Sequence, residues 1–218
     1  MRVMRSRQGI RPETFLFDRL LHIQVKHDML VIGLSSLPGG GKDYIADMLA
    51  ENHGFYKISP GDIIRAKLIS MKKGRMTREE QQELQDRLRK KYGRNYVMEL
   101  CLKKIKASGK NRIAIAGIRF PEDVEFYKNK KGIRFYNVFV YAPAKVRFKR
   151  AVDRKRVDAP ESYAAFLRSD KKEKDIFRLD ATEKISDFRL DNRENNSRKL
   201  ELEIERLMKE IGRTNSKK

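Results

Sequence analysis

The chain has 218 residues, 39% of them hydrophobic, and 51 basic against 30 acidic side chains give it a net charge of +21. This length fits one α/β domain with a small inserted lobe, and no apolar run approaches the roughly 20 residues of a membrane-spanning helix. The single cysteine, Cys101, cannot form an internal disulfide, which is typical of a reducing compartment and predicts a cytoplasmic protein. The three histidines have no metal-ligand spacing with Cys101, which argues against structural zinc.

Residues 1–28 are interpreted as an N-terminal extension. The first twelve residues carry four arginines and no acidic residue, and an apolar strand begins only at Met29. Three interpretations stay open: an organelle transit peptide, an added tail, strand or helix, and a protein start that lies at Met29 itself.

The stretch from Met29 to Tyr44 reads MLVIGLSSLPGGGKDY. An apolar run passes into a glycine-rich turn, a lysine follows, and a helical pattern begins, which is typical of a strand, a phosphate-binding loop and a helix. Backbone N–H groups can surround a phosphate only where no side chain intervenes, and the helix start adds unpaired N–H groups and partial positive charge. The residues predicted to bind the nucleotide donor here are Pro38, Gly39, Gly40, Gly41, Lys42, Asp43 and Tyr44.

The match to the pattern G-x-x-x-x-G-K-[ST] is incomplete. Ser36 replaces the first glycine, and Asp43 replaces the hydroxyl residue that usually holds Mg²⁺. The alternative is a glycine-rich turn that merely precedes a lysine, and the flanking strand and helix argue against it.

The remaining elements alternate between strands and helices. In chain order we predict a helix to Gly54, a strand at 55–58, a turn at 59–62, helices at 63–71, 77–91 and 95–105, a strand at 112–116, a short helix from Pro121, a strand at 135–141, helices after Pro143 and around Phe166, a strand at 185–190 and an amphipathic terminal helix. Thr77 and Glu80 form a capping box for the third of these helices. Repeated strand–helix units predict an α/β fold of three layers, with a mostly parallel five-stranded sheet between helices. The glycine-rich loop and lysine after the first strand are typical of the P-loop NTPase fold.

Arginines follow several of these strands. Ligands of parallel α/β sheets gather at the carboxyl ends of the strands, and the guanidinium fork suits phosphate. Phosphoryl transfer depends mostly on positioning and on stabilising charge, so a set of arginines at this edge fits that chemistry. The set comprises Arg65, Arg119, Arg150, Arg154, Arg156 and Arg168, and Asp62 stands beside it either as a helix N-cap or as a group that orients the substrate.

These motifs resemble those of nucleoside monophosphate kinase-like P-loop kinases, in particular archaeal kinases related to adenylate and dephospho-coenzyme A kinases. The resemblance covers about residues 29–210 and rests on motif order: GGGKD, then SPGDIIR, then AGIRFPEDVEFY, then the arginine-rich segment 147–173, then ISDFRLDNRE before the last helix. It implies a kinase domain at 29–210, with an acceptor-binding insertion at about 63–107, a lid at about 152–168 and a basic tail at 211–218.

The resemblance also implies residue roles and two ligands, ATP and Mg²⁺. The expected catalytic residues are Lys42, Asp62, Arg119, Arg154 and Arg156, the expected acceptor-binding residues are Asp62, Arg65, Arg119 and Arg168, Arg150 belongs to the donor site, and Asp43 is the expected metal ligand. Two departures weaken the usual Mg²⁺ arrangement: Ala116 stands where the family usually has an acidic residue, and Asp43 where it has Ser or Thr. A Lys-Asp pair also resembles phage-type deoxynucleoside monophosphate kinases and animal phosphomevalonate kinases.

The leading functional hypothesis is ATP-dependent phosphoryl transfer to a small phosphorylated acceptor, a nucleoside or deoxynucleoside monophosphate. The alternatives are a kinase for a hydroxyl acceptor of the dephospho-coenzyme A type, an inactive relative, and a nucleotide-gated RNA-binding or ribosome-assembly NTPase. The last is suggested by the net charge of +21, which attracts polyanions such as RNA, although a lysine-rich solvated surface explains it too. The sequence makes no prediction about the oligomeric state.

Overall fold

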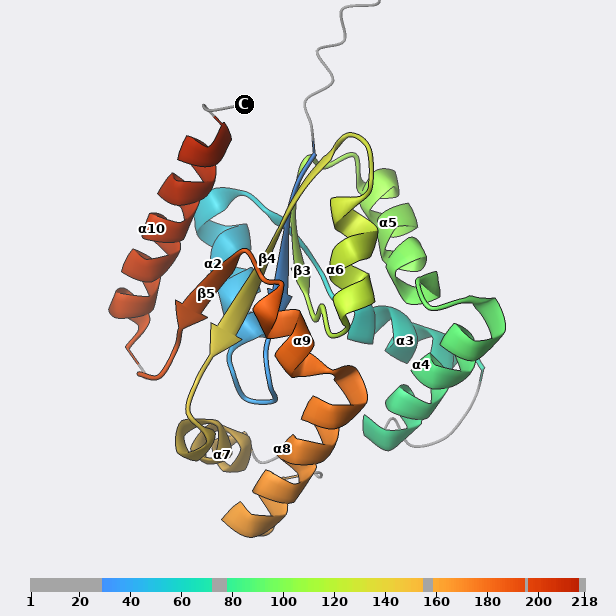
Figure 1. Cartoon of the computed structure of the whole chain (residues 1–218), viewed down its shortest axis with the longest axis vertical. Coiled ribbons are helices and arrows are strands. Elements are labelled where there is room, and N and C mark those ends of the chain that lie inside the picture. The colour runs from blue at the N-terminus through green and yellow to red at the C-terminus, as the bar shows by residue number, and fades with distance from the viewer. Residues whose placement is uncertain (1–28, 72–77, 155–158, 195, 216–218) are drawn as a thin grey trace, which may run out of the picture.

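Five parallel strands form the centre of the molecule, in the order β2-β3-β1-β4-β5 (Figure 1). The computed structural model describes residues 29–71, 78–154, 159–194 and 196–215. The strands are β1 (Met29–Ser35), β2 (Tyr56–Ile58), β3 (Arg112–Ala116), β4 (Ile133–Tyr141) and β5 (Phe188–Asp191). This order places β1 in the middle of the sheet, so the loop after β1 lies at the centre of the carboxyl edge.

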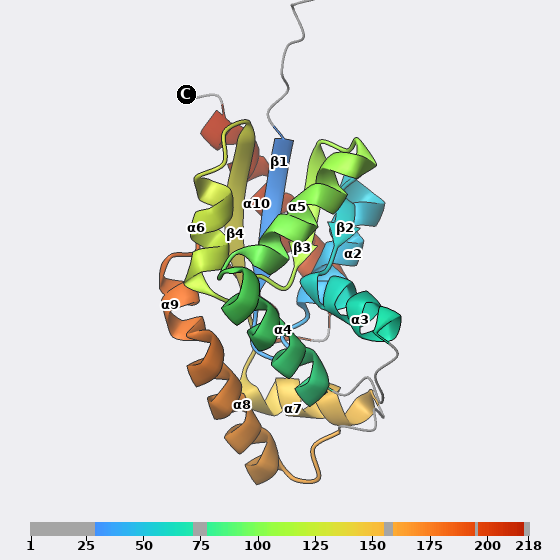
Figure 2. The same ribbon diagram turned by 90° about the vertical axis from the view of Figure 1, so that its right-hand side faces the viewer.

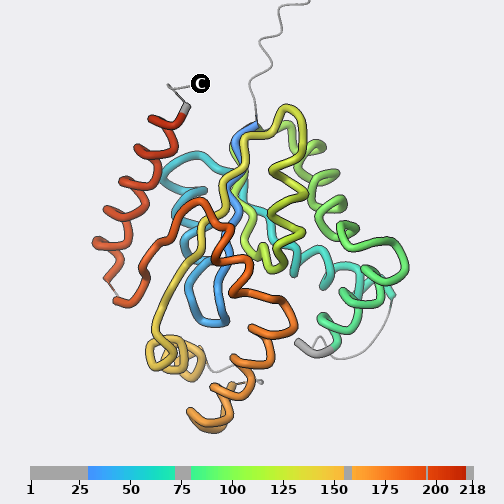
Figure 3. The backbone as a smooth tube through the Cα atoms, in the orientation of Figure 1, coloured from blue at the N-terminus to red at the C-terminus, as the bar shows by residue number. Residues whose placement is uncertain are grey.

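Nine helices of the described chain connect and cover the strands. They are α2 (Lys42–His53), α3 (Pro60–Ser70), α4 (Arg78–Tyr92), α5 (Tyr96–Ser108), α6 (Pro121–Lys128), α7 (Ala144–Asp153), α8 (Tyr163–Phe177), α9 (Leu179–Lys184) and α10 (Ser197–Asn215). Helices α2 and α10 cover one face of the sheet, α5 and α6 cover the other, and α7, α8 and α4 lie beyond the carboxyl edge (Figures 1 and 2). The tube in Figure 3 shows the loop after β1 turning back toward α2 at that edge.

Strand β1 is hydrophobic on both faces because helices cover both. Ile32 and Leu34 pack with α2 and α10, whereas Val31 packs with α5 and α6 on the opposite side. Alternate side chains of a strand point to opposite faces, so a strand buried on both sides needs a continuous apolar run. The three-layer α/β prediction is therefore confirmed.

Several local predictions need correction. Helix α3 begins at Pro60, with Ser59 as its N-cap, so Asp62 lies inside the first turn and is not the N-cap. The strand predicted from Ile185 begins at Phe188, because Ile185 ends the short helix α9, which the sequence analysis did not predict. Thr77 and the extension 1–28 lie outside the described residues.

The terminal helix and the cysteine agree with their sequence patterns. Helix α10 carries the predicted apolar stripe into the core, and Ile211 is buried, so the helix continues past the boundary expected at residue 210. Cys101 is buried, and burial, helped by the nearby charge of Asp123, raises the pKa of its thiol to about 12. The thiol therefore stays protonated at neutral pH, as expected of a small buried hydrophobe. No helix among the described residues is both long and apolar enough to cross a membrane.

Gly33 is a point of close packing within β1. A Cβ atom at this position would lie 2.6 Å from Cζ of Phe135 and 2.8 Å from Cγ1 of Ile118. Gly212, in the interior of α10, has no heavy atom within 4 Å of the corresponding position. The two glycines therefore form a matched pair, one without space for a methyl group and one with space.

We predict that Gly33→Ala lowers the free energy of unfolding by about 1–3 kcal/mol, because overpacking forces neighbouring side chains to move. Gly212→Ala should raise it by about 0.5–1 kcal/mol, because alanine is the better helix former. Urea denaturation of both variants checks this. A Gly33→Ala variant as stable as the wild type would contradict the close contact with Phe135.

Candidate functional site

The loop at 36–41 joins β1 to α2 at the carboxyl edge. Gly39 and Gly41 have φ angles of 78° and 99°, and the Gly40 N–H donates to the carbonyl oxygen of Leu37 at 3.0 Å, which closes the turn. Helix α2 begins at Lys42, and the first N–H groups of any helix have no acceptor within the helix. These amides and the positive end of the helix dipole favour an anion at this point.

The loop is held from outside by three side chains, those of Arg147, Arg150 and Asn192. Asn192 Nδ2 donates to the carbonyl oxygen of Gly40 at 2.8 Å, and a Cβ at Gly41 would collide with the same amide nitrogen. A Cβ at Gly39 would lie 2.8 Å from the carbonyl oxygen of Arg147. Gly39 and Gly41 are thus required both by their positive φ and by the close approach of neighbouring segments.

Arg147 ties the loop to two helices. Its Nε donates to the Ala142 carbonyl oxygen at 2.9 Å and its NH1 to that of Pro38 at 3.2 Å. The guanidinium also forms a two-point ion pair with Asp170 of α8, with NH2 2.7 Å from Oδ2. Both side chains are buried, so this pair connects α7, α8 and the loop through one rigid group.

Arg150 lies one turn further along α7 and reaches the same loop. Its NH1 donates to the Gly39 carbonyl oxygen at 3.3 Å and its NH2 to that of Asn192 at 2.9 Å. Burial, together with the positive charge of Arg154, lowers the pKa of Arg150. The structure thus places Arg150 beside the loop that should bind the donor; its contact with a nucleotide stays a prediction.

Lys42 and Asp43 form an ion pair at the start of α2. Lys42 Nζ lies 2.7 Å from Asp43 Oδ2, and Lys57 Nζ donates to the Asp43 carbonyl oxygen at 3.2 Å. Burial acts to raise the pKa of the Asp43 carboxyl, but Lys42, Lys57 and Arg154 outweigh it and hold that pKa below its ordinary value. Asp43 therefore stays ionised, and its side chain is half exposed, as a cation ligand would need to be.

Three segments converge beside Lys42. Gly117, directly after β3, has a φ of 127°, and a Cβ there would lie 3.5 Å from Cδ of Pro60 and 3.9 Å from Cε of Lys42. Its N–H donates to the Leu34 carbonyl oxygen at 3.0 Å, which joins the ends of β3 and β1. The start of α3 and the residues after β3 therefore flank the Lys42 side chain, as a donor site next to an acceptor site requires.

Asp62 and Arg65 lie on the first turns of α3. Arg65 NH1 donates to Asp62 Oδ1 at 2.6 Å, and both side chains are exposed. The two groups act as one pair, and the guanidinium keeps N–H donors for a further anion. Their role toward an acceptor stays a prediction.

Arg119 follows β3 and is held in place by neighbouring groups. Its backbone N–H donates to Asp123 Oδ2 at 3.3 Å, and its guanidinium lies over the Phe177 ring, 4.6 Å from the centroid. The other oxygen of Asp123 accepts a hydrogen bond from Arg89 NH1 at 3.2 Å. Arg89, from α4, in turn covers the Phe120 ring at 3.8 Å. Two guanidinium groups on aromatic faces thus form one wall beside the carboxyl end of β3.

A chain of buried and partly buried hydrogen bonds connects the start of the loop with Arg119. Ser35 Oγ donates to Asn137 Oδ1 at 3.1 Å, and Asn137 Nδ2 donates to Ser186 Oγ at 2.7 Å. Ser186 Oγ then donates to the Thr182 carbonyl oxygen at 2.7 Å, and Thr182 Oγ1 to that of Arg119 at 2.8 Å. The strand that leads into the glycine loop and the backbone of Arg119 are therefore parts of one polar network.

The other predicted residues are placed less centrally. Arg154 is exposed at the end of α7, and its positive charge helps to lower the pKa of Asp43. Tyr44 is half exposed. Arg156 lies outside the described residues. Arg168 is exposed on α8, whose inner face carries Phe166 and Asp170 instead. The structure thus brings Lys42, Asp43, Arg150 and Arg154 together, but it gives Arg168 no place at the loop.

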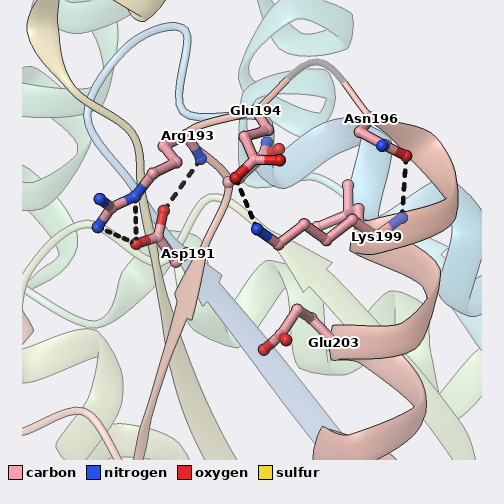
Figure 4. A pocket seen from close by; sticks show the side chains of 8 residues that line it. Asp191, Arg193, Glu194, Asn196, Lys199 and Glu203 are labelled. Carbon is pink, nitrogen blue, oxygen red and sulfur yellow. Dashed lines mark hydrogen bonds and ion pairs between the residues drawn. The ribbon is translucent and has the colours of Figure 1, made fainter.

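A hollow of about 290 Å³ lies beside this site, at the junction of β5 and α10 (Figure 4). Its lining residues all come from Asp191 to Glu203, and the figure shows Arg193 turned back onto Asp191 and Lys199 onto Glu194. Asn192, which bonds the loop, is part of this wall. The hollow is therefore adjacent to the loop but is not the place where the glycines and Lys42 converge.

Several residues of the site were not predicted from the sequence. Arg147 and Arg150 precede Arg154 at helical spacing, and this shared face was an available signal for Arg147. Arg89, Asn192 and Asn137 had no local signal, because their partners lie far away in the chain.

No protein-family model matches this chain. It is 36% identical over 147 residues to a UPF0200 protein of Methanothermobacter thermautotrophicus, covering 67% of this chain and 73% of that protein. The chain belongs to the UPF0200 family. A second member, from Thermococcus kodakarensis, is 30% identical over 187 residues, 84% of this chain and 98% of that protein.

Solved structures of P-loop kinases share the fold of this UPF0200 protein. A shikimate kinase from Acinetobacter baumannii in complex with shikimate matches with a TM-score of 0.56 and 16% identity, over 85% of this chain and 96% of that one. A shikimate kinase from Bacteroides thetaiotaomicron matches with a TM-score of 0.52 and 15% identity, over 84% and 98%. The P-loop kinase fold is thereby established, whereas the nucleoside monophosphate kinase subtype stays a hypothesis.

We predict that Arg147→Met lowers the free energy of unfolding by about 3–5 kcal/mol, because it leaves the buried Asp170 carboxylate without its partner. The double variant Arg147→Met/Asp170→Leu should recover part of this loss, since the uncompensated charge is gone. Urea denaturation of both variants measures the difference. A double variant less stable than Arg147→Met would show that the ion pair is not the main function of Arg147.

Proposed function

We propose that this UPF0200 protein is an ATP-dependent kinase that transfers a phosphoryl group to a small phosphorylated acceptor, a nucleoside or deoxynucleoside monophosphate. One observation carries the proposal: Lys42 and the amides of the glycine loop lie beside the start of α3 and the residues after β3. A donor phosphate at the loop and an acceptor at α3 would therefore meet next to Lys42.

The loop offers a fit for the donor's phosphates. Ser36 Oγ is buried at the loop and has no hydrogen-bond partner among the described residues. Such a group is costly unless a ligand or water satisfies it. Together with the helix-start amides and Lys42, it gives the loop donors that a triphosphate tail could accept from.

The acceptor would lie against the arginines. Arg65 and Arg119 would bind its phosphate, and we add Arg89, because its guanidinium shares the Asp123–Phe120 wall with Arg119. An acceptor phosphate oxygen attacks the terminal phosphorus of the donor, and the bond from that phosphorus to the bridging oxygen breaks, releasing ADP. An acceptor phosphate is largely ionised at neutral pH, since its second pKa is about 6, so the step needs no strong base.

Arg154 and Lys42 would neutralise the charge that develops during transfer, and Arg156 and Arg168 keep this role only as predictions. Mg²⁺ in kinases is held by one or two carboxylates plus substrate phosphates and stabilises charge on the phosphate oxygens. The residues here fit a site with a single protein carboxylate. Asp43, which is half exposed at the loop, would supply that carboxylate. Ala116 is buried and has no side-chain oxygen, so it would supply no second ligand. Among the described residues no cluster of three or more acidic, histidine or cysteine side chains is present for a metal.

We predict that Lys42→Ala lowers turnover by on the order of a hundredfold or more, because it removes one preorganised charge from the transferring group. Lys172→Ala, an exposed residue of α8, is the matched control and should stay within about twofold of the wild type. ADP release is measured with a panel of nucleoside monophosphates. ATP with Mg²⁺ should also raise the melting temperature of the wild type. The absence of both ADP release and any nucleotide-dependent stabilisation would reject the kinase proposal.

Asp62→Asn separates the two classes of acceptor. With a phosphate acceptor, we expect mainly a raised KM, because the Asp62–Arg65 pair that orients the acceptor is disturbed. With a hydroxyl acceptor, Asp62 would be the general base, and kcat should fall by roughly a hundredfold to ten-thousandfold. Steady-state kinetics with each acceptor that supports turnover decides between them.

A further inference from the structure

Positive charge is concentrated at the end of the sheet opposite the glycine loop. Two segments, 103–112 and 128–134, lead into β3 and β4 and end on the first residues of these strands. Together they contain nine lysines and arginines and no acidic residue. Figures 1 and 2 show both segments at the end of the molecule away from α7 and α8. Strand β1, seven residues long, separates this end from the loop by about 20 Å at the usual rise per residue.

The two segments flank the first residues of β1. The Met29 N–H donates to the Gly132 carbonyl oxygen at 3.0 Å, and the Leu30 N–H donates to that of Asn111 at 2.8 Å. Neighbouring strands are about 4.8 Å apart, so the backbones of the two segments lie about 10 Å apart across β1. We define the amino-end basic surface as the exposed basic residues of these segments other than Lys128: Lys103, Lys104, Lys106, Lys110, Arg112, Lys130 and Lys131.

This surface differs from the charged surface of helix α10. Lys128 is left out because it forms an ion pair with Asp187 at 2.8 Å. Helix α10 interleaves its five basic with four acidic residues and forms pairs such as Arg206–Glu203 at 2.7 Å. A surface that is only lysine-rich for solubility would show the same mixture. The separation of charge therefore indicates a polyanionic partner.

We propose that the amino-end basic surface binds double-helical nucleic acid through its phosphate backbone. Seven charges on both sides of β1 exceed what one small phosphate needs but suit the dense, regular charge of a duplex. The two segments contain no aromatic residue, so they cannot stack unpaired bases as single-strand binding sites do. The six lysines and one arginine of the surface would position a backbone and read no sequence. This surface is separate from the candidate kinase site, so the two proposals can fail independently.

The test compares two double variants of equal charge. Lys110→Glu/Lys131→Glu changes the surface, and Lys171→Glu/Lys172→Glu changes exposed lysines of α8; each pair lowers the net charge from +21 to +17. Binding of a labelled short RNA duplex and of the same DNA duplex is followed by fluorescence anisotropy over a range of KCl concentrations. The surface variant should bind about tenfold or more weakly, and the slope of log K against log salt should fall by about 2. The α8 variant should stay within about threefold.

Other outcomes would overturn the proposal. They are no duplex binding by the wild type at low salt, equal weakening by both variants, or binding to vesicles of anionic phospholipid but to neither duplex. The RNA and DNA arms decide which backbone is preferred. If circular dichroism shows that the surface variant does not fold, Lys110→Gln/Lys131→Gln and a matching Lys171→Gln/Lys172→Gln control replace the two pairs with the same criteria.

Discussion

The structure depends on how closely neighbouring segments approach the glycine loop. Arg147, on α7, donates a hydrogen bond to the Pro38 carbonyl oxygen, and Asn192, at the end of β5, donates one to the Gly40 carbonyl oxygen. Both contacts use main-chain carbonyl groups on the outer side of the loop. The N–H groups at the start of α2 are then left to face an anion, which is the arrangement that phosphate binding requires. The residues that bond the loop come from two different elements, α7 and the end of β5, so the loop geometry depends on the packing of the carboxyl edge.

The wall beside the carboxyl end of β3 is built by a different kind of contact. Arg89 and Arg119 each lie over an aromatic ring, and both bond the buried carboxylate of Asp123, Arg89 through its guanidinium and Arg119 through its backbone N–H. Hydrogen bonds through Asn137 and Thr182 connect this wall with the strand that leads into the loop. A change in this wall therefore has a structural route to the glycine loop.

The charge of the chain has two distinct locations. One group of arginines surrounds the glycine loop, where small anions would be held in a defined geometry. Another group of basic residues lies at the opposite end of β1, exposed and not interleaved with acidic residues. The net charge of +21 is a sum over the whole chain, so it does not distinguish these two surfaces, which differ in geometry and in the ligands expected for them. Tight, few-contact recognition fits the first surface, and salt-dependent binding to a backbone fits the second.

The sequence by itself determined the fold class and the location of the glycine loop between the first strand and its helix. Apolar strands, glycine positions and helical periodicity are local signals, and they predicted the parallel sheet, the turn at Gly39 to Gly41 and the helix that begins at Lys42. One local prediction failed at the start of α3. Proline is favoured at the first position of a helix, so α3 begins at Pro60 and Ser59 is its N-cap. Asp62, one of the predicted N-cap candidates, therefore lies inside the first turn.

Only the tertiary structure decided which distant side chains meet. The Arg147–Asp170, Asn192–Gly40 and Arg89–Asp123 contacts join residues that no short-range pattern connects. The order of the strands is decided in the same way, because pairing depends on packing between whole elements. That order brings residues 110–112 and 130–132 to either side of Met29, where two ordinary basic segments of the sequence become one surface.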